Sequence, residues 1–323
     1  MNEDQSSYIE GTAADNRLRD MFGDRLQSGV SLRRYTAAKV GGLAHKFIEA
    51  RSSQELLEIV TTLWGKEIPF LILGSGSNVL ISDSGVREVV ILNRSREHRF
   101  DRQMESPTVW AESGTNLSLL ARLAAQKGLA GLEWAAGIPG TLGGAVVGNA
   151  GAHGKDIAGS LLMAEILHRE VRQKGHIILQ KQWPVEQLEY SYRTSSIKGN
   201  RGDAIVLSAL LQLAHGSTQE IQKNIDEFTA FRKRTQPPGA SMGSMFKNPP
   251  DDYAGRLIEA AGLKGFYIGD AEISSLHANF FINRGNASAE DIRTLINLAR
   301  KKVAEEFDIQ LELEIVLLGD WKD

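Results

Sequence analysis

The chain has 323 residues, of which 32 are glycine, 8 are proline and none is cysteine, so a disulfide framework, a zinc ribbon, a cysteine nucleophile and a thioether-linked flavin are excluded. With 42% hydrophobic and 24% charged residues it has the composition of a folded protein, and a formal charge of −3 argues against a nucleic-acid partner. No stretch approaches the ~18 apolar residues of a membrane span, so we expect a cytoplasmic protein with no membrane partner.

Residues 1–25 are polar and aperiodic, which predicts a flexible N-terminal tail or a frayed first helix. The first folded unit, residues 26–93, has an α/β pattern. Apolar residues recur at helical spacing over residues 53–64, which predicts one helix. Short strands are predicted over residues 68–73, 79–81 and 89–92.

The second unit, residues 94–216, opens with an arginine-rich stretch and carries most of the unusual glycine content. A helix is predicted over residues 116–127. Strands are predicted over residues 109–112, 162–167, 176–179 and 204–213. Ten glycines lie between Gly128 and Gly159, so nearly a third of all glycines lie in a tenth of the chain.

The third unit, residues 217–310, is predicted to begin with a helix that ends at Pro237-Pro238. Ser217-x-x-Glu220 matches a capping box. The side chains predicted to face the core from this helix are Ile221, Ile225, Phe228 and Phe231. Further helices are predicted over residues 254–261 and after the cap residue Ser288, with strands near 271 and over 278–282; residues 311–318 are β-rich.

A glycine turn follows the predicted strand over residues 68–73. Its sequence is Gly74-Ser75-Gly76-Ser77-Asn78. Glycine lets backbone N–H groups approach an anion without a Cβ in the way, as in many pyrophosphate sites. The spacing matches neither the P-loop nor the G-x-G-x-x-G pattern. Taken alone, such a turn is more often structural than ligand-binding.

A second glycine-rich run, over residues 137–151, is more specific. It has few side chains with which to fill a core, so we expect an extended ligand to lie along its exposed backbone amides and to bridge both glycine segments. The alternative is a tight bundle of turns at a domain junction. The candidate ligand-binding residues of the run are Gly137, Ile138, Pro139, Gly140, Thr141, Gly143, Gly144, Asn149, Ala150 and Gly151.

Three further segments carry polar residues with catalytic potential. Ser244 follows a glycine in a predicted loop, but G-x-S-x-G and a convincing triad are absent, so a proton donor and a plain loop residue both remain open. Arg193 and Glu314, taken alone, are typical of solvated side chains. No metal site and no protein partner can be inferred.

In their order these segments resemble the UDP-N-acetylenolpyruvoylglucosamine reductase family, over about residues 30–320. The short interval between Tyr192-Arg193 and Arg232 is similar to the subclass without the extra loop that carries a substrate-closing tyrosine. The matching motifs are Leu73-Gly74-Ser75-Gly76-Ser77-Asn78, Gly137-Ile138-Pro139-Gly140-Thr141, Gly143-Gly144-Ala145, Asn149-Ala150-Gly151, Tyr192-Arg193, Arg232 with Thr235-Gln236-Pro237, Gly243-Ser244-x-Phe246-Lys247-Asn248-Pro249, His277-Ala278-Asn279-Phe280 and Leu311-Glu312-x-Glu314.

The resemblance implies an α+β fold, with a two-part vanillyl-alcohol-oxidase-like (PCMH-type) FAD-binding region and a smaller α/β substrate-binding domain. It implies that residues 311–323 carry a catalytic glutamate back toward the first FAD-binding subdomain. Both glycine segments would hold non-covalent FAD. The implied reaction is the NADPH-dependent reduction of UDP-N-acetylglucosamine enolpyruvate to UDP-N-acetylmuramate, for peptidoglycan precursor synthesis in the bacterial cytoplasm.

The resemblance also implies roles for individual residues. Ser244 would donate the proton, and Arg193 and Glu314 would act on the enolate-like intermediate. The implied substrate-binding residues are Tyr192, Arg232, Lys247 and Asn248. A guanidinium that holds a carboxylate favours an intermediate with charge on that carboxylate. Because an ionised Glu314 would repel this charge, we hypothesise that Glu314 is protonated in the working complex.

Some positions depart from the family pattern, and two other functions remain open. Ser75 stands where glycine is common and His153 where tyrosine is frequent, which bears on flavin contacts; Thr194 is a mild departure, and we expect His277 to be structural. One alternative is an FAD oxidase or dehydrogenase of the same fold that acts on a sugar or alcohol. The other is a flavin- or nucleotide-binding regulatory module with a decayed site.

Overall fold

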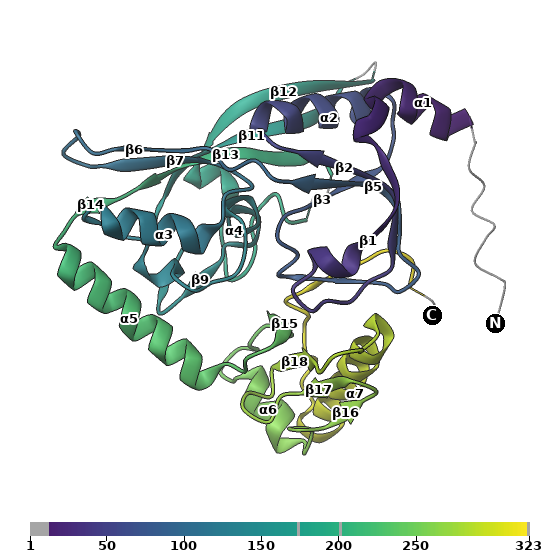
Figure 1. The fold of residues 1–323 in the computed structure, drawn as a ribbon. Helices are drawn as coiled ribbons and strands as arrows, with labels where there is room; N and C mark the ends of the chain where they lie inside the picture. The colour runs from purple at the N-terminus through teal and green to yellow at the C-terminus, as the bar shows by residue number, and fades with distance from the viewer. Residues whose placement is uncertain (1–12, 173–174, 200–201, 322–323) are drawn as a thin grey trace.

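The computed structural model describes residues 13–172, 175–199 and 202–321. Two units with β-sheets form the upper part of the molecule in Figure 1, and a C-terminal unit lies below them. Helix α5 (Thr218–Thr235) runs diagonally from the upper part to the lower one.

The first unit is built on a four-stranded sheet in the order β1-β2-β5-β3, in which β2 and β3 run parallel to β5 and β1 is antiparallel to β2. Its strands are β1 (Gln27–Ser31), β2 (Leu43–Ala50), β3 (Phe70–Leu73) and β5 (Val86–Asn93). Helix α2 (Ser53–Gly65) packs on this sheet through the apolar face that its spacing predicts, and Ser52 caps it. The sequence did not predict β1 or β2.

Part of the expected flexible tail is ordered in the structure. Residues 13–22 form helix α1 (Ala13–Phe22), followed by the 3-10 turn η1 (Gly23–Arg25). Leu18 of α1 is buried in the same core as α2, which explains why this segment is helical despite its polar composition. Residues 1–12 lie outside the described residues. Another 3-10 turn, η2 (Leu32–Tyr35), follows β1.

The second unit is a five-stranded antiparallel sheet in the order β12-β11-β13-β7-β6. Helices α3 (Leu117–Gln126) and α4 (Leu142–Gly148) and the turn η3 (Glu133–Ala135) pack on it around the buried Trp134. The strands are β6 (His98–Asp101), β7 (Thr108–Glu112), β11 (Leu161–Arg172), β12 (Gly175–Pro184) and β13 (Ala204–Gln212). Smaller elements are β8 (Leu129–Ala130) paired with β14 (Ala214–His215), β9 (Gly151–Ala152) paired with β10 (Lys155–Asp156), and η4 (Val185–Leu188).

The C-terminal unit is a four-stranded antiparallel sheet in the order β15-β18-β17-β16, covered by α6 and α7. After it the chain returns to the first unit, where β19 pairs in parallel with β4. The elements are β15 (Ala240–Ser244), α6 (Ala254–Ala260), β16 (Tyr267–Ile268), β17 (Ala271–Ile273), β18 (Phe280–Asn283), α7 (Ala289–Phe307), β19 (Val316–Leu318) and β4 (Val79–Ile81).

Three local expectations in the third unit are wrong. The Ser217 side chain makes no capping hydrogen bond with the described residues, and the first turn of α5 is exposed, where water satisfies its N–H groups. Phe231 is 47% exposed, since only the first half of α5 lies on the core. Ser244 ends strand β15 and does not lie in a loop. Ser288 does cap α7, in a capping box with Asp291.

The C-terminal unit is fixed to the first unit by directed polar contacts. The two carboxylate oxygens of Asp83 accept from the N–H groups of Ala289 and Glu290 at the start of α7, each at 3.0 Å. Asn283 Nδ2 donates to the Ala38 carbonyl oxygen at 2.9 Å. Because the N–H groups of a first helical turn have no partner within the helix, the Asp83 carboxylate completes the cap of α7 from another unit.

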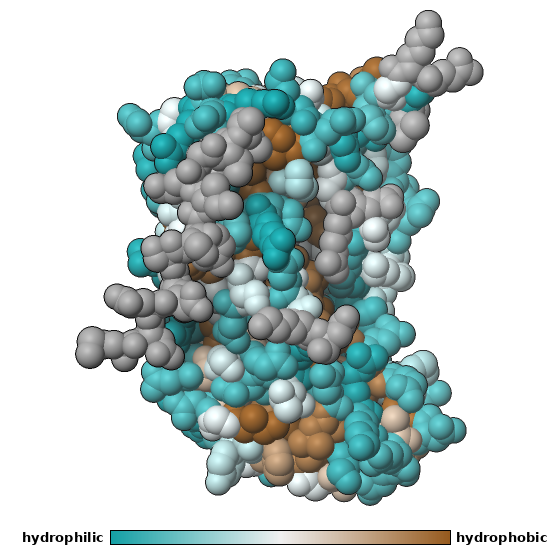
Figure 2. Space-filling model, turned by 90° about the vertical axis from the view of Figure 1, so that its right-hand side faces the viewer, coloured by the Kyte–Doolittle hydropathy of each residue, from teal (hydrophilic) through white to brown (hydrophobic). Residues whose placement is uncertain are grey.

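Hydrophilic residues cover most of the surface in Figure 2, and hydrophobic residues show on the lower, C-terminal unit and in a strip above it. Among the described residues, no helix is both long and apolar enough to cross a membrane.

Candidate functional site

The two glycine segments, which come from different units, lie against each other. A Cβ on Gly74 would lie 2.7 Å from Thr141 Oγ1, and a Cβ on Gly140 would lie 3.4 Å from Ser77 Oγ. Gly76 has φ +62, and a Cβ there would overlap the Tyr35 carbonyl oxygen. The close approach of the two segments therefore requires glycine at Gly74, and the approach of the turn to the Tyr35 backbone requires it at Gly76.

The shorter glycine turn presents backbone N–H groups without acceptors. The carbonyl oxygens of Gly76 and Asn78 accept from Ala37 and Val316, at 2.9 and 3.0 Å. In contrast, the N–H groups of residues 75–77 donate to no atom of the described residues. Successive free N–H groups in a turn form a concave site for an anion such as a pyrophosphate.

The longer glycine run keeps only part of the expected free backbone amides, because among its residues the N–H groups of Gly140 and Thr141 donate to no atom of the described residues. The N–H groups of Gly137, Ile138, Gly143, Gly144 and Ala150 all donate within the protein, for example from Gly143 to the Ser113 carbonyl oxygen at 2.7 Å. The run also leaves open a surface without side chains, because Gly144 is exposed and a Cβ on Gly148 would meet nothing within 4 Å among the described residues. Such a surface suits a flat ligand, and the N–H groups of Gly140 and Thr141 are left to donate to it.

Asn149 has a structural role that the sequence did not reveal. It takes the left-handed conformation at the end of α4, with φ 44. Its Nδ2 donates to Asp156 Oδ2 at 3.1 Å and to the Ser191 carbonyl oxygen at 3.2 Å, and its Oδ1 accepts from Ala158 N–H. The buried Asn149 side chain thus fixes the turn that carries Arg193 relative to the glycine run.

Arg193 and Glu314, 121 positions apart in the sequence, form an ion pair. Arg193 Nε lies 3.0 Å from Glu314 Oε1, but its N–H is not directed at that oxygen and has no hydrogen-bond acceptor. Arg193 has φ +57 at the tip of the turn that Ser191 and Thr194 close. Lys198, which sequence reasoning missed, donates from Nζ to the Arg193 carbonyl oxygen at 2.6 Å.

Glu314 is an acid in a mainly buried setting, with its side chain 16% exposed. Burial raises the pKa of Glu314 above its usual value, and the nearby cations Arg193, Lys198 and Lys247 only partly oppose this effect. A raised pKa is the direction that our hypothesis of a protonated Glu314 requires.

The segment after Ser244 pairs with the segment that carries Glu314. Glu314 N–H donates to the Met245 carbonyl oxygen at 3.0 Å, and Lys247 N–H donates to the Glu312 carbonyl oxygen at 2.9 Å. Asn78 Nδ2 of the glycine turn donates to the Glu314 carbonyl oxygen at 3.1 Å. Backbone pairing therefore brings the segments of Ser244, Glu314 and the glycine turn together.

The four predicted substrate-binding residues lie in different settings. Tyr192 is 56% exposed, and Arg193 lies over its ring. Arg232 on α5 lies beside Gly137, and burial lowers its pKa.

The other two make contacts within the C-terminal unit. Lys247 Nζ pairs with Glu312 at 3.1 Å. Asn248 Oδ1 accepts from the N–H of Ala254, at the start of α6, at 3.1 Å, which gives Asn248 a structural contact in addition to its predicted role.

His153 and His277, the two histidines named in the sequence analysis, both contact other residues of the protein. His153 stacks on Phe228 with ring centroids 4.1 Å apart, and burial next to Arg232 lowers its pKa. Its Nε2 is buried and has no hydrogen-bond partner. His277 Nδ1 accepts from Asn279 N–H at 3.2 Å, which gives its ring a structural contact.

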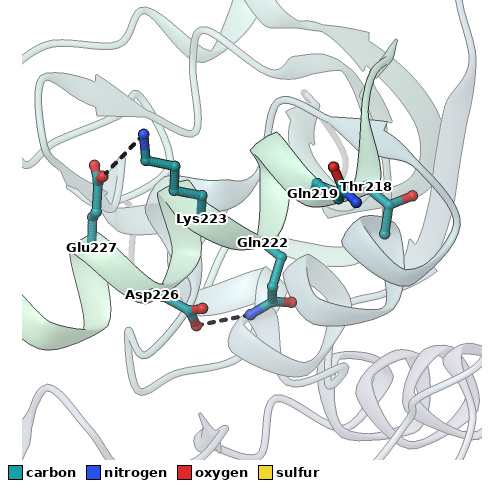
Figure 3. Close-up of a pocket in the computed structure, with 6 residues that line it drawn as sticks. All are labelled: Thr218, Gln219, Gln222, Lys223, Asp226 and Glu227. Carbon is teal, nitrogen blue, oxygen red and sulfur yellow. Dashed lines mark hydrogen bonds and ion pairs between the residues drawn. The ribbon is translucent and has the colours of Figure 1, made fainter.

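A hollow on the outer face of α5 lies apart from these groups, and none of the predicted site residues lines it. Figure 3 shows its side chains along the helix, four of which form two pairs. Gln222 Nε2 donates to Asp226 Oδ1 at 2.8 Å, and Lys223 lies 4.0 Å from Glu227. We assign no function to this hollow.

Comparisons with known proteins agree with this geometry. Residues 44–169 match the model of an FAD binding domain, and residues 235–318 match the C-terminal domain of UDP-N-acetylenolpyruvoylglucosamine reductase. The reductase of that name from Chloroflexus aggregans is 41% identical over 90% of this chain and 96% of its own length. The one from Rubrobacter xylanophilus is 42% identical over 90% of this chain and 94% of its own length.

A crystal structure of UDP-N-acetylenolpyruvylglucosamine reductase from Thermus caldophilus is 36% identical and has a TM-score of 0.74 over 91% of this chain and 99% of its own. This likeness and the two matched domains confirm the predicted α+β fold, with an FAD-binding region followed by a smaller C-terminal domain. The chain belongs to the UDP-N-acetylenolpyruvoylglucosamine reductase family and is an FAD-dependent oxidoreductase.

Proposed function

We propose that this protein reduces the enolpyruvyl ether of UDP-N-acetylglucosamine to the lactyl ether, UDP-N-acetylmuramate, with NADPH as the reductant, for cytoplasmic peptidoglycan precursor synthesis. The observation that carries the proposal is the pairing of Arg193 with a mainly buried Glu314, on a segment joined by backbone hydrogen bonds to those of Ser244 and Asn78. The family relation supports the same substrate.

The residues of the glycine segments fit FAD. The free N–H groups of residues 75–77 would hold its pyrophosphate, and the surface of the longer run, without side chains, would lie against its ring. When bound, FAD would take up hydride from NADPH and supply it to the terminal carbon of the enolpyruvyl group.

The chain's own residues then complete the reduction. Hydride addition leaves negative charge next to the substrate carboxylate, and the Arg193 guanidinium would hold that carboxylate. Ser244 would donate the proton to the carbon next to the carboxylate, so that one hydride and one proton saturate the double bond. Glu314 in its protonated form would donate a hydrogen bond to the intermediate, and the raised pKa of Glu314 supports that role.

Substrate-dependent recovery of the flavin spectrum tests the proposal. Purified protein should be yellow, NADPH should bleach it, and the enolpyruvyl substrate should restore the colour. Ser244→Ala should keep bleaching by NADPH nearly normal and slow the recovery with substrate by ~10²-fold or more, because general acid catalysis contributes about that much.

Other outcomes would contradict it. Bleaching without recovery by the substrate would favour an oxidase or dehydrogenase acting on another sugar or alcohol. A colourless protein that takes up no FAD would favour a decayed binding module. Equal loss of both half-reactions in Ser244→Ala would show that Ser244 is structural.

A further inference from the structure

Strand β15, which ends at Ser244, is irregular where the chain leaves the sheet. Strand β15 pairs with β18 at Ser244 and Phe280, but the register shifts between Ser241 and Ser244, and Gly243 has φ +77. Beyond Ser244 the chain leaves β15, so the backbone N–H and carbonyl groups of the buried Met245 and Phe246 need hydrogen-bond partners from elsewhere.

Asn279 satisfies these groups with both its side chain and its backbone. Asn279 Nδ2 donates to the Phe246 carbonyl oxygen at 2.8 Å, and Oδ1 accepts from Phe246 N–H at 2.9 Å. The Asn279 carbonyl oxygen accepts from Met245 N–H at 2.8 Å. The primary amide thus pairs with Phe246 as a neighbouring strand would, and at 3% exposure it is shielded from water.

The opposite side of the same backbone carries Glu314. The Met245 carbonyl oxygen accepts from Glu314 N–H at 3.0 Å, and Phe246 pairs with Leu313 in an isolated bridge. The Met245-Phe246 backbone is therefore held between the Asn279 amide and the segment of Glu314. A shift of that backbone would move Ser244 and Glu314 together.

We propose that Asn279 is a positioning residue for the reduction step, which sets the place of Ser244 relative to the substrate. The inference rests on the proposed function, in which Ser244 donates the proton. Misplacement of a reacting group by ~1 Å costs ~10²-fold in rate. We therefore expect Asn279→Asp to slow the recovery of the flavin spectrum by substrate ~10–100-fold and to leave bleaching by NADPH within about twofold.

Asn283 provides a matched control. It is a second buried asparagine, at the end of β18, whose Nδ2 donates to the Ala38 carbonyl oxygen and whose Oδ1 accepts from the N–H groups of Gly285 and Ala287. Asn283→Asp likewise places a carboxylate oxygen against a carbonyl oxygen, but away from Ser244. Asn283→Asp should lower the melting temperature, and it should change the rate of bleaching by NADPH and the rate of recovery by substrate by the same factor.

The experiment compares Asn279→Asp, Asn283→Asp, Ser244→Ala and the double variant Ser244→Ala/Asn279→Asp as FAD-loaded full-length proteins. If Asn279 acts through Ser244, the double variant loses less than the product of the two single losses. Deuterium uptake over residues 243–248 should rise in Asn279→Asp and stay at the parent level in Asn283→Asp. If Asn279→Asp does not fold, Asn279→Ala, which removes the amide without adding a charge, carries the same expectations.

Equal slowing of both half-reactions in the Asn279 variant, equal effects in the two asparagine variants, or multiplicative losses would overturn the inference. Normal recovery by substrate in Ser244→Ala would instead overturn the role proposed for Ser244. The two failures are therefore distinguishable.

Discussion

The contact between Gly74 and Thr141 predicts a measurable coupling between the two glycine segments. In Gly74→Ala, the new Cβ would lie 2.7 Å from Thr141 Oγ1 and 3.2 Å from its Cγ2, so the segments must separate. Overpacking of this kind costs ~1–3 kcal/mol. We expect Gly74→Ala to lower the melting temperature of the FAD-free protein by roughly 2–4 °C per kcal/mol and to weaken FAD binding.

Thr141→Ala removes the clashing atoms at a smaller cost. Thr141 Oγ1 caps α4 by accepting from Gly144 N–H at a long 3.4 Å, so its loss should cost at most ~1 kcal/mol. The double variant Gly74→Ala/Thr141→Ala should then be about as stable as Thr141→Ala alone. This gives a coupling free energy of ~1–3 kcal/mol between the two positions.

The cycle is measured on four proteins, namely the parent, Gly74→Ala, Thr141→Ala and the double variant. Their melting temperatures without FAD and fluorescence titrations with FAD are compared. Gly148→Ala is the control, because its Cβ meets nothing within 4 Å, and alanine in a helix should leave the FAD-free protein as stable as before or more so. Additive losses from Gly74→Ala and Thr141→Ala would refute the reasoning, since the two segments would then not be in contact.

Two further predictions concern the docking of α7 and the acid Glu314. Asp83→Ala should destabilise the C-terminal unit by ~0.5–2 kcal/mol because the N–H groups of Ala289 and Glu290 lose their acceptors while Ser288 still caps α7, and it should speed limited proteolysis there; unchanged digestion would contradict this. Since the folded-state pKa of Glu314 is raised, the native protein binds more protons than the unfolded chain above about pH 4.5, and its stability falls as pH rises through that pKa. The free energy of unfolding, measured with urea from pH 5 to 8, should therefore fall less steeply with pH in Glu314→Gln than in the parent protein. Equal slopes would contradict the raised pKa.

The sequence correctly predicted features that depend on residues close together in the chain. The apolar face of α2 and the cap at Ser288 follow from residues within one or two turns, and both are present. Ser217 matches the same capping pattern, yet its side chain makes no capping hydrogen bond with the described residues, because the pattern gives residue types and not the orientation of the side chain. Strand β2 was missed although it is central to the first sheet.

The arrangement of the site depends on contacts between distant parts of the chain, which local patterns do not contain. The ion pair of Arg193 and Glu314 could be anticipated only through the family resemblance. The same resemblance marked Asn149 for FAD binding, where the structure shows a side chain occupied by hydrogen bonds within the protein. Lys198, which holds the Arg193 carbonyl, had no signal in the sequence, and the family resemblance placed Asn279 in a motif without indicating a role for it. Both roles depend on which backbone groups the fold leaves unpaired.

The parallel pairing of β19 with β4 has a consequence for how the protein acquires its activity. The ladder joins residues 237 positions apart, and the hydrogen bond between Asn78 and Glu314 joins residues 236 positions apart. Closing such a long loop is entropically unfavourable until the intervening units have folded. Glu314 therefore reaches its place only when the whole chain is assembled, and catalytic activity reports on completed folding in a way that the helix content of the separate units does not.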